Sequence, residues 1–464
     1  MKRKTIKNTA SFSGVGLHTG AQVNVTIKGA DGGSGIKFYR SDIDDDTALA
    51  ADVSNVIATN RGTTLRKGEV EVATVEHLLS AVHSLGIDDL HITLDGPEMP
   101  IMDGSSVMFY NALVEAEVID TDKDRDYLVI NEMITYKDEE SGAELIALPS
   151  DFFEITTLID FNSDYLGQQY ADFGFDDDYV KDIAPARTFA FLHELEALFD
   201  QGLIKGGDLD NAVIIANEKL SDEKLASLSN KLGKGELRVD EAGVLNTSKL
   251  RFTNEPARHK LLDVIGDLSL VGHPIKGRIV ATKPGHKANI EFAKILKKHW
   301  QAQRKLKGRP SYDPTATPVF DTEQVQKMLP HRYPFLMIDK IISCTEDLVV
   351  GIKNVTANEA CFQGHFPGNS VFPGVLQMEA LAQTGGILAI NSMGAEEQWD
   401  TYFLKMDNVK FKSKVVPGDT LLLKMELMSP IRRGIIQMKG TAYVGDKIVS
   451  EGELTAQVVK RTKS

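Results

Sequence analysis

Cysteine is scarce in this sequence, with only Cys344 and Cys361 among 464 residues. Two cysteines cannot build the disulfide framework of a secreted scaffold, so we expect a reducing compartment. No apolar run approaches the roughly 20 residues that a membrane-spanning helix requires. The basic start Met1-Lys2-Arg3-Lys4 is not followed by the apolar segment of a signal peptide. These absences predict a cytoplasmic protein without a membrane span.

Positive charge is also under-represented. The formal net charge is −14, from 52 Lys+Arg against 66 Asp+Glu. Residues 318–464 hold 16 charges of each sign, so the excess of acid lies entirely in residues 1–317. A surface with this excess of negative charge repels the phosphate backbone, and we expect no nucleic-acid partner.

The length of 464 residues and the 42% hydrophobic composition allow roughly three domains. Strand-like and helix-like segments alternate along residues 1–300, so both kinds of element are expected in this part of the chain. Residues 301–319 are polar and basic and contain three prolines, as expected of a partly extended linker. We therefore divide the chain into residues 1–122, residues 123–300, a linker at 301–319, and residues 320–464.

Hydrophobic periodicity and turn residues predict the individual elements. A helix is expected from about Val72 to Gly86, with Thr74 as its cap. A stronger helix is expected at 254–270, capped by Asn254 and with Pro256 in its first turn. Further helices are expected at 184–199 and 290–300. Strands are expected at 22–27, 35–39, 87–94, 127–134, 144–148, 212–215 and 275–283.

The helix at 254–270 carries a candidate metal site. His259 and Asp263 are four residues apart and share one helix face, which Asp267 continues by a turn. Two such ligands suit zinc, although an ordinary ion pair has the same spacing. Glu76-His77 on the earlier helix could add a third ligand and a free carboxylate. Such a carboxylate is the usual general base in metal-assisted amide hydrolysis.

Short motifs with glycine, histidine and acidic residues are spread over residues 1–295. They are Ser13-Gly14-Val15-Gly16-Leu17-His18-Thr19-Gly20, Thr74-Val75-Glu76-His77-Leu78, Ala186-Arg187-Thr188-Phe189, His259-Lys260-Leu261-Leu262-Asp263, Gly266-Asp267-Leu268 and Gly285-His286. Together they resemble the UDP-3-O-acyl-N-acetylglucosamine deacetylases, the zinc amidohydrolases of lipid A synthesis. The resemblance implies two similar α+β domains, packed helix layer to helix layer with Zn2+ between them, and a UDP-linked acylated glucosamine as substrate.

The same resemblance implies roles for the residues at the metal. His77, His259 and Asp263 would bind zinc, and Glu76 would deprotonate the zinc-bound water. Thr188 would steady the tetrahedral oxyanion beside the metal.

Other motif residues would act around the metal. His286 would be the cationic acid that helps the amine leave, with Asp267 holding its ring. Lys260 would point the other way along its helix turn and contact a substrate phosphate. Phe189 would line the sugar site. His18 either lines the site as well or is structural.

A second constellation lies between Gly364 and Met393. A loop rich in proline and glycine leads into a segment, from Val375 onward, that is apolar nearly all round, and this predicts a buried helix. Glu379 lies in the first turns of that helix, where a carboxylate is costly unless it is paired or its pKa rises. His365 on the loop and Glu379 are a candidate acid–base pair. The alternative is a core histidine and a surface glutamate.

The motif Gly364-His365-Phe366-Pro367-Gly368 and the upstream segment Leu329-Pro330-His331-Arg332-Tyr333-Pro334-Phe335 carry a further resemblance. From about Phe320 to Lys460 the chain is similar to 3-hydroxyacyl-[acyl carrier protein] dehydratases, which implies a hot-dog fold. His331 would be a structural element of the motif. The strands around the helix are expected at 348–355, 402–411, 420–427, 434–443 and 447–459.

Dehydration of a 3-hydroxyacyl thioester needs a base, an acid and a group that holds the oxyanion. His365 has a suitable intrinsic pKa to remove the α-proton. Glu379, with its pKa raised by burial, can protonate the β-hydroxyl. The N–H of Gly374, at the start of the helix, is assigned to the thioester oxyanion.

The dehydratase resemblance also implies partners. Family members form dimers through this domain, often trimers of dimers, with each site shared between two subunits. Acyl carrier proteins are typically acidic. Lys410, Lys412 and Lys414 should face one way along a strand, and with Arg432 and Arg433 they predict a docking patch. Scattered solvated charges are the alternative.

These patterns predict a bifunctional enzyme, a zinc deacetylase joined to an acyl-carrier-protein dehydratase. Two alternatives stay open. The C-terminal module could be a thioesterase or a catalytically silent acyl-binding scaffold. The N-terminal half could be a structural metal-binding module.

Overall fold

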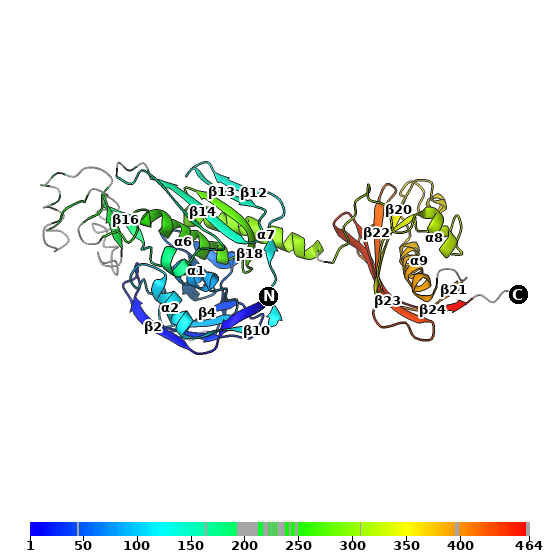
Figure 1. Ribbon diagram of the computed structural model, residues 1–464, viewed down its shortest axis with the longest axis horizontal. Coiled ribbons are helices and arrows are strands. Elements are labelled where there is room, and N and C mark those ends of the chain that lie inside the picture. Colours follow the sequence, from blue (N-terminus) through cyan, green and yellow to red (C-terminus); the bar gives the residue numbers. More distant parts are fainter. Residues whose placement is uncertain are drawn as a thin grey trace. The chain divides into compact units, whose positions relative to one another are not determined.

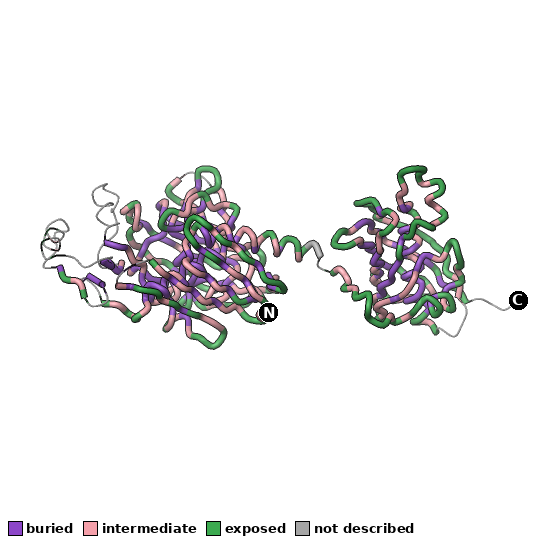
Figure 2. Tube along the Cα trace, turned by 90° about the horizontal axis from the view of Figure 1, so that it is seen from above, coloured by how far each residue is buried: buried purple, intermediate pink, exposed green. Residues whose placement is uncertain are grey.

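A computed structural model describes most of the chain. The described residues are 1–464 without 44–45, 162, 164, 193–211, 217–220, 222, 224, 226, 228, 230–236, 241–242, 246–248, 307, 395–398 and 461–464. The chain divides into two compact units, Met1–Gln301 and Ala302–Ser464. Buried residues fill the interior of each unit (Figure 2). Among the described residues, no helix combines the length and the apolar character that crossing a membrane requires. The finer division of the chain into four segments stays a prediction.

The first half of the N-terminal unit is built on one mixed sheet. Its strands, in spatial order, are β2 (Ala10–Val15), β3 (Gln22–Gly29), β9 (Leu90–Leu94), β4 (Ile36–Arg40) and β5 (Leu49–Ala50). In β3, Val23, Val25 and Ile27 are buried and alternate with more exposed residues, because successive side chains of a strand point to opposite faces. The strands expected in this half are confirmed, with shifted ends.

The second half repeats this topology. Its sheet has the order β12 (Ile134–Asp138), β13 (Ala143–Leu148), β18 (Ile275–Thr282), β14 (Phe153–Asp160) and β15 (Gln168–Phe173). In both sheets the third and fourth strands are parallel and the other neighbours are antiparallel. The strand expected at 127–134 is wrong for most of its length, since only β11 (Leu128–Val129) forms there.

Smaller elements complete the unit. The minor sheets pair β1 (Lys2–Ile6) with β10 (Val118–Asp124), β6 (Val56–Ala58) with β7 (Thr64–Lys67) and β8 (Val70–Val72), and β16 (Phe189–Phe191) with β17 (Val213–Ile215). Short helices are η1 (Val53–Asn55) and α3 (Tyr179–Asp182). The strand expected at 212–215 is confirmed. The helix expected at 184–199 is wrong at Phe189–Phe191, which form a strand, and residues 193–199 lie outside the described residues.

The long helices are α1 (Glu76–Ser84), α2 (Val107–Glu115), α6 (Glu255–Ser269) and α7 (His286–Leu306). Figure 1 shows α1 and α6 side by side between the two large sheets. Pro256 lies in the first turn of α6 as expected. Because α7 continues to Leu306, residues 301–306 of the predicted, partly extended linker are helical.

Neither of the two predicted helix caps forms the hydrogen bond that was expected of it. Thr74 does not cap α1, which begins at Glu76, and its hydroxyl instead donates to Glu98 at 3.0 Å. Asn254 occupies the N-cap position of α6 without capping its N–H groups, because its amide donates to the Tyr170 carbonyl. In both places a partner distant in sequence replaces the local bond.

The helices α1 and α6 approach closely at a glycine. A Cβ atom added to Gly266 would lie 2.1 Å from the backbone oxygen of Glu76. Only a residue without a side chain fits at this crossing. The contact sets the spacing between the two halves at the level of Glu76 and the neighbouring His77.

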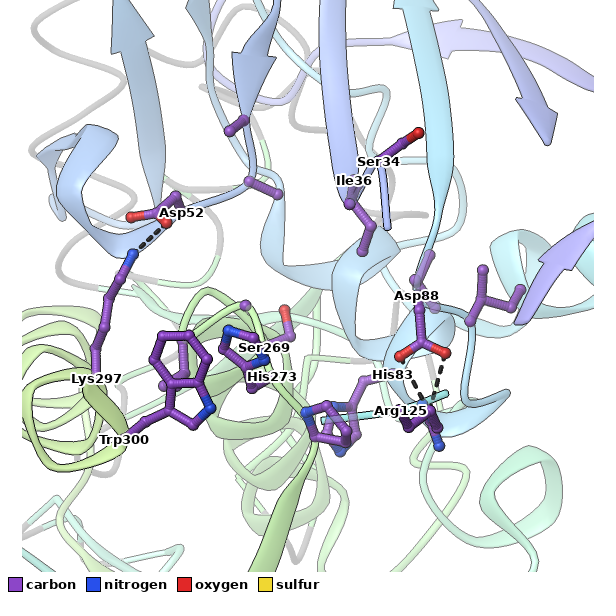
Figure 3. A pocket seen from close by; sticks show the side chains of 18 residues that line it. Ser34, Ile36, Asp52, His83, Asp88, Arg125, Ser269, His273, Lys297 and Trp300 are labelled. Atoms are coloured by element: carbon purple, nitrogen blue, oxygen red, sulfur yellow. Dashed lines mark hydrogen bonds and ion pairs between the residues drawn. The ribbon is translucent and has the colours of Figure 1, made fainter. Parts of the chain in front are cut away.

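Ion pairs join the two halves around a cavity of about 290 Å³ (Figure 3). On one side Lys297 of α7 pairs with Asp52 of the first half. On the other side Arg125, which follows β10, pairs with Asp88 at 2.9 Å. Between them the rings of His273 and Trp300 stack at 3.7 Å. The charged groups of this cavity therefore already serve to hold the halves together.

The C-terminal unit is an antiparallel sheet that packs against one long helix, α9 (Gly374–Met393) (Figure 1). The spatial order is β19 (Lys340–Cys344), β20 (Leu348–Asn354), β22 (Thr420–Leu427), β23 (Ile435–Val444), β24 (Lys447–Lys460) and β21 (Trp399–Phe411). Shorter helices are α8 (Thr322–Met328) and η2 (Ala360–Gln363). The strands expected here are confirmed, and β19 is an additional one.

Burial along α9 agrees with the expectation from Met378 to Ile390 except at Glu379 and Ala382, which are only partly buried, so the prediction of a buried carboxylate is wrong. Val375 also departs from the expected burial, since 72% of its surface is exposed. The apolar start of α9 is therefore not covered within this unit.

The α1–α6 contact yields a stability prediction. Gly266→Ala should destabilise the N-terminal unit by about 1–3 kcal/mol, the usual cost of overpacking, because the clash is with rigid backbone. Differential scanning calorimetry would measure the loss. Gly386→Ala in α9 is the matched control, since its added Cβ would meet Leu329 at an ordinary 3.5 Å. Equal melting temperatures for the Gly266→Ala variant and the wild type would contradict the conclusion that only glycine fits at this helix crossing.

Candidate active sites

His77 from α1 converges with His259 and Asp263 from α6 between the two halves. Their potential ligand atoms all lie within 4.8 Å of one another. The Nε2 atoms of His77 and His259 are 3.7 and 3.3 Å from Oδ1 of Asp263. All three side chains are buried. The structure thus brings together the three residues that the sequence predicted as metal ligands.

The protonation states suit a metal ion. Burial lowers the pKa of His77 to about 3 and also lowers that of His259, so both imidazoles are neutral at pH 7. Burial alone would raise the pKa of Asp263, but the positive charges of Lys260 and His286 outweigh it and lower this pKa. Two neutral imidazoles and one carboxylate are a donor set typical of zinc sites with an open position.

Two hydrogen-bonding observations support the fit. Oδ1 of Asp263 is buried and has no hydrogen-bond partner among the described residues, which is rare for a carboxylate in a protein interior. Nδ1 of His259 faces the Ala186 carbonyl at 3.1 Å, which leaves Nε2 directed to the cluster. The residues present can therefore hold a divalent metal ion.

Glu76 precedes His77 and is held separately from the cluster. Its Oε2 accepts a hydrogen bond from the backbone N–H of Thr63 at 3.0 Å. Burial raises the pKa of Glu76 to about 7, with Asp267 adding to the effect. A carboxyl group with a pKa near neutrality can both accept and return a proton, as a general base requires.

His286, at the start of α7, is paired with Asp267 of α6. Its Nδ1 lies 2.9 Å from Oδ2 of Asp267. Burial would lower the pKa of His286, but Asp267 raises it to about 9. The imidazole is therefore a cation at neutral pH, which matches the predicted acid.

Sequence reasoning missed two partners of Asp267. The Thr63 hydroxyl donates to Oδ1 at 2.6 Å, and the Asn289 amide donates to Oδ2 at 2.8 Å. Asn289 follows His286 by three residues on α7, a spacing that could have found it. No sequence pattern links Thr63 to Asp267, because 204 residues separate the two.

The predicted direction of the Lys260 side chain is wrong. It was expected to point away from the metal ligands, but its Nζ donates to Oδ2 of Asp263 at 2.9 Å and lies over the Phe189 ring at 5.7 Å. Residues three apart on a helix share a face, which explains the contact. Phe189 also meets the His259 ring edge-on at 6.3 Å.

Thr188 and His18 are positioned through their backbones. The Thr188 N–H donates to the Gly104 carbonyl at 2.7 Å. The His18 N–H donates to Glu98 at 3.0 Å, and among the described residues its buried Nε2 has no partner. Within the part of the chain that the structure describes, no hydrogen bond joins either side chain to the three-residue cluster, and their predicted roles stay predictions.

A buried ion pair anchors the segment around Thr188. Arg187 Nε lies 2.9 Å from Oε1 of Glu255, and the Arg187 backbone N–H also donates to that oxygen. Glu255 is the first residue of α6, the helix that carries His259. The pair therefore couples this segment to the metal-binding helix.

In the C-terminal unit, His365 lies on the loop before α9. Its Nδ1 is 2.7 Å from the Val371 carbonyl, a contact that requires a proton on Nδ1 and leaves the Nε2 lone pair free. Gly374 begins α9, where the first N–H groups have no acceptor within the helix. A Cβ at Gly374 would lie 2.7 Å from the Phe411 ring, so the exposed ring would have to move to admit a side chain.

Glu379 is held on α9 by a polar contact. Its Oε1 accepts a hydrogen bond from Gln383 at 2.8 Å and lies 3.7 Å from Nε2 of His331. Gln383 also accepts from the Met337 N–H, which the sequence reading missed. Within the described part of this chain, His365 makes no contact with Glu379.

A mainly apolar cavity of about 230 Å³ adjoins Glu379. Its lining comes from the helix, the sheet and the segment before them, and includes Leu329, Phe335, Gly386, Met425, Met438 and Leu454. An aliphatic chain fits such a lining, and the carboxyl group of Glu379 would lie at its wall.

The predicted strand face of three lysines does not form as expected. Strand β21 ends at Phe411, so Lys412 and Lys414 lie beyond it and strand alternation does not apply to them. Lys412 and Lys410 both lie near Glu451, at 2.8 and 3.8 Å. The carrier-protein patch stays a prediction.

Comparison with known proteins identifies relatives of both units. Residues 3–232 and 232–298 match the family of UDP-3-O-acyl N-acetylglycosamine deacetylases, and residues 329–453 match the FabA-like domain. Proteins named bifunctional enzyme LpxC/FabZ from Bacteroides thetaiotaomicron and Porphyromonas gingivalis are 45% and 43% identical, over 99% of this chain and of each relative. A UDP-3-O-acyl-N-acetylglucosamine deacetylase from a Geobacter species is 38% identical over 64% of this chain and 89% of its own length.

The cluster predicts metal-dependent stability. A chelator should lower the melting temperature of the N-terminal unit and leave that of the C-terminal unit unchanged, because a ligand bound only to the folded state stabilises it by about 4 kcal/mol at 1,000 times its Kd. Calorimetry with and without the chelator measures both transitions. Asp263→Asn should bind less metal and show a smaller chelator effect, whereas a full effect would exclude Asp263 as a ligand.

Proposed function

The chain belongs to the family of bifunctional LpxC/FabZ enzymes, and from this premise we propose how its two units work. The N-terminal unit deacetylates UDP-3-O-(3-hydroxyacyl)-N-acetylglucosamine in lipid A biosynthesis. The C-terminal unit dehydrates 3-hydroxyacyl-[acyl-carrier-protein] to the trans-2-enoyl product in fatty acid synthesis. The observation that carries the first activity is a three-residue metal cluster beside a carboxyl group, Glu76, that is not a ligand.

In the deacetylase, His77, His259 and Asp263 would hold zinc. When bound, zinc would polarise the amide carbonyl and lower the pKa of a water molecule. Glu76 accepts the proton of the attacking water, which its pKa of about 7 supports.

Cationic His286 then donates a proton to the nitrogen of the leaving amine, and Asp267 keeps the imidazole charged and oriented. Thr188 donates a hydrogen bond to the developing oxyanion. Lys260, Phe189 and His18 contact the substrate. The position of Lys260 beside Asp263 supports a contact near the reacting amide more than one with a distant phosphate.

In the dehydratase, a hot-dog fold surrounds α9. Nε2 of His365 removes the α-proton of the thioester, Glu379 gives a proton to the departing β-hydroxyl, and water leaves. The Gly374 N–H donates to the thioester oxygen as negative charge develops there. The free Nε2 of His365 and the apolar cavity beside Glu379 support these assignments.

The dehydratase site is formed by a dimer. Strand β21 is an edge strand, and five of its large apolar side chains are exposed by 39–58%: Tyr402, Phe403, Leu404, Met406 and Phe411. A long apolar edge of this kind is normally covered by another chain. The lack of contact between His365 and Glu379 within the described part of one chain also supports a site completed by a partner subunit.

Zinc dependence separates the two activities. Asp263→Ala, or chelation, should abolish deacetylation and leave dehydration intact, because each unit has its own core and site. Both reactions are assayed on the same preparation, so dehydration reports on folding and concentration. Equal loss of both activities in a folded variant would contradict the assignment of Asp263 to the deacetylase site alone.

Glu76→Gln tests the base. The variant should keep its zinc and lose about 10²–10⁴-fold in deacetylation rate, the range of general acid–base catalysis. Metal analysis of the purified variant is the necessary companion measurement. A stoichiometric loss of zinc would instead make Glu76 a ligand.

The shared dehydratase site is tested by complementation. His365→Ala and Glu379→Ala proteins should each be inactive, whereas co-expression should restore about a quarter of wild-type sites, since about half of random dimers are mixed and each mixed dimer has one intact site. Differently tagged chains verify co-assembly. Verified mixed dimers without dehydratase activity would place both residues of a site on one chain.

A further inference from the structure

Glu98 is a buried carboxylate outside the site residues described so far. Its exposed fraction is 0%. Oε1 accepts hydrogen bonds from the His18 N–H and the Thr74 hydroxyl, each at 3.0 Å. Oε2 accepts from the N–H and the hydroxyl of Thr19, each at 2.8 Å. A carboxylate offers about four acceptor positions, so donors from two separate segments saturate this one.

The first segment is the loop that carries His18. Its ends are held by bonds from the Gly16 N–H to the Ala21 carbonyl and from the Gly20 N–H to the Gly16 carbonyl. A Cβ at Gly16 would lie 2.5 Å from Oε2 of Glu98, so the loop is closed tightly on the carboxylate. Glu98 thereby holds the backbone of His18 in place.

The second segment is the turn into α1. Thr74 has a φ of 57°, a left-handed conformation that is costly for a β-branched residue and needs support from its surroundings. The chain beside Glu98 supplies it, since the Ala73 N–H donates to the Pro97 carbonyl and the Met99 N–H donates to the Ala73 carbonyl. Glu76 and His77 follow directly, so this turn sets the direction in which α1 begins.

We propose that Glu98 is a positioning residue of the deacetylase, which holds the His18 loop and the start of α1 in one fixed arrangement. The inference rests on the proposed deacetylase function and adds to it a residue that touches neither metal nor substrate. A carboxylate suits this task because every group that it contacts is a donor. A simple hydrophobic contact could bring the segments together but would not orient their N–H and hydroxyl groups.

Glu98→Gln is the sharpest test, because the amide keeps the size of the side chain and replaces one acceptor oxygen with a donor. The His18 N–H lies 3.0 Å from Oε1 and 3.1 Å from Oε2, so in either orientation the amide nitrogen faces this donor and the bond to the His18 loop is weakened. We expect kcat/KM for UDP-3-O-acyl-N-acetylglucosamine to fall by up to about 100-fold, as ångström-scale misplacement does. A raised KM should be part of the loss, and zinc content should be unchanged.

The KM distinguishes positioning from mere folding. Partial unfolding would reduce the amount of active enzyme and hence the apparent kcat, but would leave KM unchanged. Calorimetric titration of the metal-free variant with the same substrate adds a readout without turnover, and weaker binding is expected. Glu69→Gln, an exposed carboxylate with the same change in charge, is the matched control and should behave like the wild type.

Thr19→Val keeps the test decisive if the Glu98 variant fails to fold. It removes the hydroxyl that donates to Glu98 and accepts from the Ala21 N–H, and leaves the carboxylate in place. It too should raise KM. Suppose that the wild-type enzyme deacetylates and that the folded Glu98→Gln protein has an unchanged KM and substrate affinity. This result would overturn the inference and leave the proposed function intact. If Glu98→Gln does not fold, the same result in Thr19→Val would have this consequence. A wild-type protein without deacetylase activity would instead overturn the proposed function.

Discussion

Backbone contact between α1 and α6 is the constraint on which the N-terminal unit depends. At Gly266 the helices are close enough that no side chain fits between them. This spacing brings His77 of one half within 3.7 Å of Asp263 of the other. Neither helix alone holds three ligands, so the chemistry requires both halves in a fixed relation.

Duplicate topology explains how such a site can be built. Each large sheet exposes one apolar face, which must be covered by helices. When the two helix layers pack together, the residues between them are buried from both sides. The charged groups there are stabilised by one another rather than by water, as Asp267 shows by its bonds to His286, Asn289 and Thr63.

The C-terminal unit uses a different principle. One helix carries Glu379 and the acceptor-free N–H groups near Gly374, and the sheet packed against it lines an apolar cavity. Gln383 orients the carboxylate through a single hydrogen bond, with far less charge around it than in the N-terminal site. The unit leaves an apolar edge strand open, which is consistent with a function that needs a second subunit.

The sequence by itself determined the three residues of the metal cluster and most of the strands. Spacing placed His259 and Asp263 on one helix face, and period-2 patterns located β3 and β13, because these signals are local. Tertiary structure decided what local patterns cannot encode. Thr74 bonds to Glu98 instead of capping its helix, Lys260 turns toward Asp263, and Thr63 joins the site across 204 residues. In each case a buried group must find a partner, and the available partner is chosen by the packing of distant segments rather than by neighbours in the chain.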